Sequence, residues 1–189
     1  MDTPVSPFTF LALDPVSNSY QQAAVVVLPV PYDCTASFRS GARDGPEAII
    51  SASRELEEYD FELRIEPSSR GIHTAAAIEP YQGSPEGMVE RVANVVDRVT
   101  RNGKLPVVLG GDHSVTIGAV RAFASQYKDL SILYLDAHAD LRDQYLGTRW
   151  GHASVARRVS EICPVVLVGV RSMSREEAEF IDSSGMAMF

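Results

Sequence analysis

Short apolar runs alternate along the chain with segments of helical periodicity. Four runs have the length and apolar continuity of strands that are buried on both faces of a sheet: 23–30, 105–109, 132–135 and 164–170. Apolar residues at helical spacing, with cap or breaker residues at the ends, predict helices from about Glu47 and at 84–102, 115–126, 152–159 and 174–185. This alternation predicts an α/β fold, in which a parallel sheet has helices on both faces.

Cap residues define two of these helices. Ser84 is the predicted N-cap of the longest helix, and Gly103 follows its last residue. Ser174 and Glu177 have the spacing of a capping box for the last helix. One face of the longest helix carries an apolar stripe that we assign to the core: Met88, Val92, Val95, Val96 and Val99.

Weaker patterns complete the outline of the chain. Residues 1–22 contain three prolines and predict an irregular opening segment. Residues 59–65 alternate apolar and polar side chains, which predicts a strand near the sheet edge. The polar stretch 141–151 predicts a loop that could cover a site. The helix after Pro46 is expected to direct three apolar side chains to one side: Ile49, Ile50 and Leu56.

The run 132–135 ends in three residues of the kinds that bind metals. Asp136, His138 and Asp140 alternate with alanines, so an extended backbone directs all three side chains to one side. They follow the carboxyl end of a predicted strand, which is where open α/β sheets bind their ligands. The pattern therefore predicts a site for one or two cations.

A second cluster follows the run 105–109. The sequence GGDHS presents His113 at the carboxyl end of this strand, and its two glycines permit a tight turn. A mixed set of imidazole and carboxylate groups suits borderline divalent ions such as manganese, zinc or iron. A single Asp or His after a strand is usually a cap or a satisfied polar group, but four ligand-type residues at two strand ends favour a metal site.

Length, charge and cysteine content narrow the class of protein. The 189 residues predict a single domain, and 17 basic against 25 acidic residues give a net charge of −8, which argues against a nucleic-acid or anionic-membrane surface and favours a cationic ligand. Cys34 and Cys163 are too few for a disulfide framework and predict free thiols. No apolar stretch is long enough for a membrane span, and the N-terminus lacks a basic start followed by an apolar core, so a cytoplasmic location is expected. The sequence has no nucleotide-binding glycine motif, which gives nucleotide binding no support.

With both clusters described, the chain resembles the ureohydrolase family of arginases and agmatinases. LGGDHSVTIGAVRA and ILYLDAHAD are similar to the first and second signatures of that family. VPYDCTASFRSGARDGPEAI and LRDQYLGTRWGHASVARRV look like the bacterial agmatinase branch. The resemblance extends over nearly the whole chain from about Val25 and implies an arginase-like three-layer fold.

The resemblance assigns roles to individual residues. It implies two Mn²⁺ ions, with His113 and Asp140 as ligands of one ion, Asp136 bridging the pair and His138 binding the second. It also implies that a hydroxide between the ions attacks the guanidinium carbon of the substrate. His152, in WGHASV, matches a family histidine that would pass a proton to the departing amine. The alternative for His152 is a solvent-exposed residue at a helix start.

The family has a third signature, a strand that ends in Asp-x-Asp, and a later glutamate, and neither is found in this sequence. We therefore expect residues 1–189 to be one α/β domain that is incomplete at its C-terminus, with four of six metal ligands. In the family, the last two strands lie between the strand before GGDHS and the strand before DAHAD. Without them, the apolar side chains and backbone groups of both flanking strands, the one before GGDHS and the one before DAHAD, are expected to be uncovered.

The expected function is hydrolysis of a linear guanidino compound, first of all agmatine to putrescine and urea, by a homo-oligomer. Guanidinobutyrate, proclavaminate-type amidino compounds and arginine remain open as substrates. A second possibility is a non-catalytic family fragment that contributes to an oligomer, which the missing third signature favours. A metallophosphoesterase, which shares Asp-x-His at 136–138, is disfavoured because the sequence has no Gly-Asn-His cluster.

Overall fold

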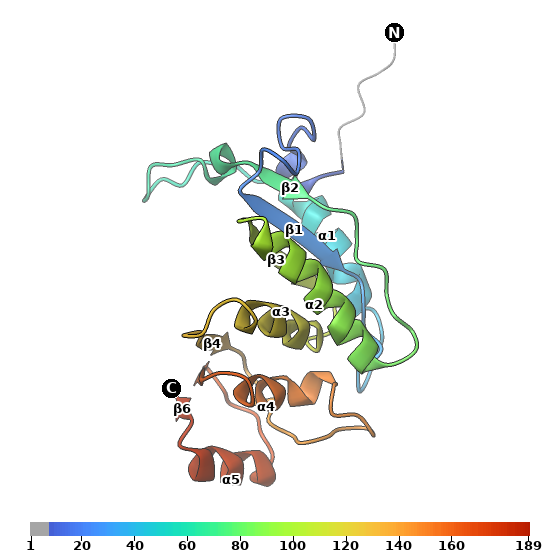
Figure 1. The fold of residues 1–189 in the computed structure, drawn as a ribbon, viewed down its shortest axis with the longest axis vertical. Helices are drawn as coiled ribbons and strands as arrows, with labels where there is room; N and C mark the ends of the chain where they lie inside the picture. Colours follow the sequence, from blue (N-terminus) through green and yellow to red (C-terminus); the bar gives the residue numbers. More distant parts are fainter. Residues whose placement is uncertain (1–7) are drawn as a thin grey trace.

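The computed structural model describes residues 8–189, so the first part of the predicted opening segment lies outside the described residues. The chain forms two separate three-stranded parallel sheets surrounded by helices (Figure 1). The first sheet has the order β2-β1-β3, with β1 Val25–Val30, β2 Ile72–Thr74 and β3 Leu105–Gly110. The second has the order β4-β5-β6, with β4 Ile132–Leu135, β5 Val165–Val168 and β6 Ala187–Met188.

Five α-helices follow the predicted positions: α1 Gly45–Ser53, α2 Pro85–Arg101, α3 Val115–Ala124, α4 Val155–Ser160 and α5 Arg175–Ser184. Four short 3-10 helices lie in the connections: η1 Phe10–Ala12, η2 Ala42–Asp44, η3 Pro67–Arg70 and η4 His152–Ser154. Figure 1 shows α1 and α2 on opposite sides of the first sheet. Parallel sheets with flanking helices confirm the predicted α/β class.

The molecule has two halves, one built on each sheet and its core, and the helices α2 and α3 join them. On α2, Val92 belongs to the core of the first sheet, whereas Val89 packs in the core of the second with Ile117 of α3. The two helices approach closely, because a Cβ atom on Gly118 would lie 2.4 Å from the carbonyl oxygen of Val89. The predicted cap at Ser84 is present, with its side chain accepting a hydrogen bond from the backbone N–H of Gly87.

The strands β3 and β4 each have one edge without a strand partner among residues 8–189. Leu133 and Leu135 of β4 are 66% and 71% exposed, and Leu105 of β3 is 57% exposed. The prediction that these strands are buried on both faces is therefore wrong for this chain. The expectation that apolar side chains on both strands are uncovered is confirmed.

The predicted strand at 59–65 is also wrong. These residues form a turn closed by a single antiparallel bridge between Asp60 and Ile65, and the alternating apolar side chains are exposed. The strand at the edge of the first sheet is instead β2, which is too short to give a pattern. In α1 only Ile50 of the three predicted apolar residues is buried, because Ile49 is exposed and Leu56 lies beyond the helix end.

Cys34 and Cys163 are both free, and burial raises the pKa of the Cys163 thiol. Within residues 8–189, none of the helices combines the length and the apolar character that crossing a bilayer requires.

Candidate metal centre

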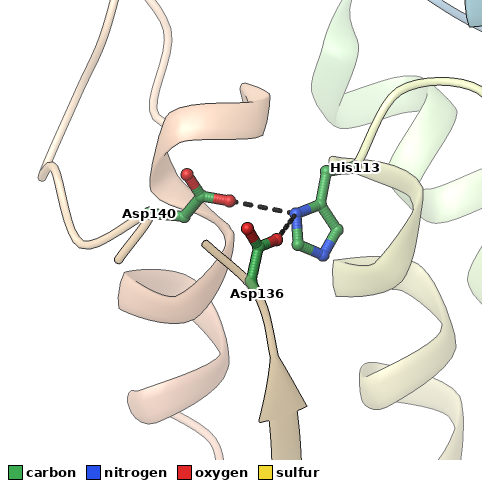
Figure 2. Close-up of side chains that lie close together, drawn as sticks. All are labelled: His113, Asp136 and Asp140. Atoms are coloured by element: carbon green, nitrogen blue, oxygen red, sulfur yellow. Dashed lines mark hydrogen bonds and ion pairs between the residues drawn. The ribbon is translucent and has the colours of Figure 1, made fainter. Parts of the chain in front are cut away.

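Three of the four predicted metal ligands lie together. His113 follows β3, whereas Asp136 and Asp140 follow β4, and one ligand atom from each lies within 4.8 Å of the others (Figure 2). The Nδ1 atom of His113 is 2.9 Å from Oδ2 of Asp140 and 3.4 Å from Oδ2 of Asp136. One imidazole and two carboxylates around a single point suit a borderline divalent cation, so the residues present fit a metal.

The fourth predicted ligand, His138, lies beside Asp136 but outside this group of three. Its Nδ1 atom is 3.5 Å from Oδ1 of Asp136, and its backbone N–H donates to the same oxygen at 2.8 Å. The two oxygens of Asp136 therefore face two different histidines. A carboxylate in this arrangement can serve as a shared ligand of two cations. The side chain of His138 is 66% exposed, which leaves one side of it open.

Backbone geometry fixes where these ligands lie. A Cβ atom on Gly111 would lie 2.6 Å from the carbonyl oxygens of Tyr32 and Ala42, so this position of the GGDHS turn requires glycine. Asp140 has a φ of 49°, in the left-handed region that non-glycine residues seldom adopt. The following residue is held by a hydrogen bond from the backbone N–H of Leu141 to Oε1 of buried Glu177. Backbone strain such as the left-handed φ of Asp140 is typical of functional positions.

Tyr134 supports two of the ligands from inside the core. Its hydroxyl donates to Oδ2 of Asp140 at 2.9 Å, and its ring stacks on that of His113 with centroids 5.2 Å apart. Burial, and secondarily the charge of Asp140, raises the pKa of the Tyr134 hydroxyl, so the hydroxyl keeps its proton as a donor. Along the sequence, Tyr134 only continues the apolar run 132–135. The signal that could have identified it is its hydroxyl, because a buried tyrosine hydroxyl needs a hydrogen-bond partner.

The ligands line an open cavity of about 840 Å³. Arg142 and Tyr145, from the loop predicted at 141–151, also line it, and so does His152. The structure therefore brings the predicted proton-transfer residue and the predicted covering loop to the same cavity as the ligands. Histidine can take up and release a proton near neutral pH, which suits a group beside a reacting amine.

The loop after β1 is held in place by a buried carboxylate. Asp33 accepts a hydrogen bond from Nε of Arg43 at 2.7 Å and another from the backbone N–H of Gly41 at 2.7 Å. The hydrogen bond from Arg43 lowers the pKa of Asp33 to about 2, against the opposing effect of burial. This pair fixes the loop that contains Thr35, and in which Ser37 lines the cavity.

Known proteins are similar to this chain in sequence and in fold. A family model described as the arginase family matches residues 23–189. The chain belongs to the arginase family. Relatives within it include an N(1)-aminopropylagmatine ureohydrolase of Thermus thermophilus, which is 44% identical over 171 residues, and an agmatinase of Bacillus subtilis, which is 32% identical over 188 residues. The crystal structure of agmatine ureohydrolase of Thermoplasma volcanium superposes with a TM-score of 0.85 at 33% identity.

These arginase-family relatives are longer than this chain. The match with the Thermus protein covers 90% of this chain and 58% of that protein, and the match with the Bacillus protein covers 98% and 64%. The match with the Thermoplasma structure covers 97% of this chain and 61% of that protein. The chain therefore spans about three fifths of the relatives it matches, including the two clusters that form the candidate metal centre.

Proposed function

We propose that the protein hydrolyses the guanidino group of a small, linear, cationic substrate. The observation that carries this proposal is the convergence of His113, Asp136 and Asp140 from two strand ends, in a chain of the arginase family. The names of the relatives, which include agmatinases and N(1)-aminopropylagmatine ureohydrolases, support a guanidino substrate. The net charge of −8 favours a cationic ligand.

The resident metals under this proposal are two Mn²⁺ ions. His113 and Asp140 would hold one ion, His138 would hold the other, and Asp136, which lies beside both histidines, would contribute to both. When bound, divalent ions of this kind lower the pKa of water enough to supply a nucleophile at neutral pH. Four residues are few for two ions, so we propose that further ligands complete the second site in particular, where only His138 and Asp136 contribute.

The proposed reaction forms one bond between carbon and oxygen and breaks one between carbon and nitrogen. Water adds its oxygen to the guanidinium carbon, urea leaves, and the two water protons end on the departing amine, which is released as an ammonium ion. His152 is the proposed carrier of one of these protons, because it lines the same cavity as the ligands. This role requires an imidazole nitrogen that is free to exchange a proton.

Agmatine is the first candidate substrate, and its products would be putrescine and urea. A second candidate is N(1)-aminopropylagmatine, because relatives with this name are 44%, 37% and 36% identical to the chain. Both are linear guanidino compounds without an α-carboxylate, which distinguishes them from arginine. The extra aminopropyl group of the second would need room beyond the metal centre, and the ligands line an open cavity of about 840 Å³.

The test is release of urea by the purified protein in the presence of Mn²⁺. Agmatine, N(1)-aminopropylagmatine, arginine and guanidinobutyrate are compared at equal concentrations, and one of the first two is expected to be the best substrate. Asp136→Asn is expected to abolish release because it weakens both metal positions. Asp129→Asn, a change of the same kind at an exposed position before β4, is the matched control.

The same experiment separates the proposal from its alternatives. A strong preference for arginine would overturn the assignment to compounds without an α-carboxylate. Binding of Mn²⁺ without release of urea from any of the four compounds would contradict catalysis by this chain and favour the non-catalytic role considered above. Equilibrium dialysis with metal analysis gives the binding arm of this comparison.

A further inference from the structure

A buried set of hydrogen bonds connects three loops around the cavity. Thr35, in the loop after β1, donates from its backbone N–H and from Oγ1 to Oδ2 of Asp112, at 2.8 and 2.6 Å. The backbone N–H of His152 donates to Oγ1 of Thr35 at 2.9 Å, and Nδ1 of His152 lies 3.3 Å from the same oxygen. Thr35 and Asp112 are 8% and 5% exposed, so these bonds lie largely out of contact with solvent.

The hydrogen-bonding capacity of the threonine hydroxyl determines the direction of each bond. Both carboxylate oxygens of Asp112 accept from backbone N–H groups, Oδ2 from Thr35 and Oδ1 from Ser114 at 3.0 Å. Asp112 thus accepts hydrogen bonds through both of its carboxylate oxygens, and the single hydroxyl proton of Thr35 is donated to its Oδ2. Oγ1 then has only lone pairs to offer, and it accepts from the backbone N–H of His152 and from Nδ1–H of the His152 ring.

This arrangement selects one form of the imidazole. A ring whose Nδ1 donates to Thr35 carries its proton there when neutral, which leaves the lone pair on Nε2. Tyr145 meets the same ring edge-on, with centroids 5.7 Å apart and planes at 90°, and so limits its rotation. Nε2 is then the nitrogen left to exchange a proton with a group in the cavity that His152 lines.

We propose that Thr35 is a positioning residue for His152: its hydroxyl, polarised by Asp112, holds the His152 ring with Nδ1 protonated and Nε2 available. The role in catalysis rests on the proposed function, whereas the effect on the ring does not. A histidine oriented by an acceptor on Nδ1 is a recurrent arrangement for proton transfer, and loss of such a partner leaves the ring free to adopt the other tautomer.

The test compares Thr35→Val, which keeps the shape and removes the hydroxyl, with Thr35→Ser, which keeps the hydroxyl. Nitrogen-15 NMR of the metal-free protein reads the tautomer of the His152 ring directly. The wild type and Thr35→Ser are expected to carry the neutral-form proton on Nδ1, and Thr35→Val is expected to shift it toward Nε2. Thr100→Val removes a comparably buried hydroxyl in α2, far from His152, and is expected to leave the signal unchanged.

Urea release by the Mn²⁺-loaded protein gives the second readout. Thr35→Val is expected to lower kcat by about 10- to 100-fold with little change in KM, and Thr35→Ser is expected to stay within about 3-fold of the wild type. The proposal would be overturned if the nitrogen-15 signal of His152 were the same in Thr35→Val as in the wild type. An equal fall of kcat in Thr35→Val and Thr35→Ser would also overturn it. If the wild type releases no urea, the proposed function fails and the NMR comparison alone decides the role of Thr35.

Discussion

At the scale of single residues, a side chain outside the ligand set contacts the candidate centre from the core. Tyr134 contacts two of the three grouped ligands, through its hydroxyl bond to Asp140 and its ring stacking on His113. Second-layer partners of this kind orient a ligand and set its affinity for the ion. Their loss should therefore be measurable as metal binding, without reference to turnover.

Tyr134→Phe is expected to weaken Mn²⁺ binding by about 10- to 100-fold while leaving the fold intact. The phenyl ring fills the same volume, and the substitution removes only the hydroxyl, with its hydrogen bond to Asp140 and its 3.2 Å contact with Nδ1 of His113. Titration of Mn²⁺ followed by electron paramagnetic resonance measures the affinity. Tyr127→Phe, at an exposed tyrosine after α3, is the control, and equal affinities for the two variants would contradict the role of the Tyr134 hydroxyl.

Asp33 should make stability depend on acid in a defined range of pH. Its pKa is lowered from 3.8 to about 2 in the folded state, first of all by the hydrogen bond from Arg43. A lowered pKa stabilises the fold above the unfolded value and ceases to do so as the pH falls toward the folded value. The contribution is thus complete at neutral pH and is lost between about pH 4 and pH 2.

Asp33→Asn is accordingly expected to lower the free energy of unfolding by about 2 kcal/mol at pH 7. Below pH 4 the difference from the wild type should shrink, because the wild-type carboxylate becomes protonated. Urea unfolding at several pH values measures both quantities. Asp182→Asn, at an exposed position of α5, should show neither effect, and a pH-independent difference for Asp33→Asn would disprove the ionic origin of the stabilisation.

At the scale of elements, α5 is connected to the candidate centre through its first turn. Glu177 closes the capping box with Ser174, and its Oε1 also accepts from the backbone N–H of Leu141, next to the ligand Asp140. One buried carboxylate therefore caps a helix and anchors the backbone of the site. Removing it would leave buried donors without partners.

Glu177→Ala is expected to cost about 1–3 kcal/mol in the free energy of unfolding. The same variant should also weaken Mn²⁺ binding, because the backbone beside Asp140 loses its anchor. Glu176→Ala, at the exposed neighbouring position in the same turn, should cost much less. Chemical unfolding and metal titration of the two variants make the comparison, and equal losses would contradict the anchoring role of Glu177.

The bounds of an element were predicted most closely where cap and periodicity agree. For α2, Ser84, the apolar stripe and Gly103 all indicate the same bounds. The error at 59–65 has the opposite cause, since alternation there is not accompanied by burial and a local turn uses the backbone groups. β2 and β6 have only three and two residues, too few to form a pattern.

The candidate centre was predictable as far as strand ends determine it. His113, Asp136 and Asp140 follow strands whose carboxyl ends could be expected to meet, and they are the group that the structure brings together. Thr35 could not be found in this way. It lies in a loop, 77 residues from Asp112 and 117 from His152, and nothing in the sequence links the three positions.

At the scale of the whole molecule, the two sheets share no strand pairing among residues 8–189, and α2 and α3 span the distance between their cores. The open edges of β3 and β4 lead to the candidate centre, because His113 follows one strand and Asp136 the other. A parallel strand that paired with either edge would bring its own carboxyl end to the same place. Until they are paired, such edges favour association between chains.

Leu133→Glu is therefore expected to reduce association of the chain at high protein concentration. The substitution places a charge on the open edge strand, where Leu133 is 66% exposed. Leu146→Glu makes the same change in a loop, at a side chain that is 70% exposed, and should have a smaller effect. Light scattering over a series of concentrations compares the two, and equal behaviour would mean that overall charge rather than the strand edge governs association.

The origin of the grouped ligands in two different sheets has a thermodynamic consequence. A cation that binds His113 together with Asp136 and Asp140 is a cross-link between two halves of the molecule that no backbone ladder joins. Metal binding and the packing of the two halves then belong to one linked equilibrium. A free ion concentration of 100 times Kd raises the free energy of unfolding by about 2.7 kcal/mol. The supply of metal would in that case govern how firmly the halves are held, in addition to any chemistry that it supports.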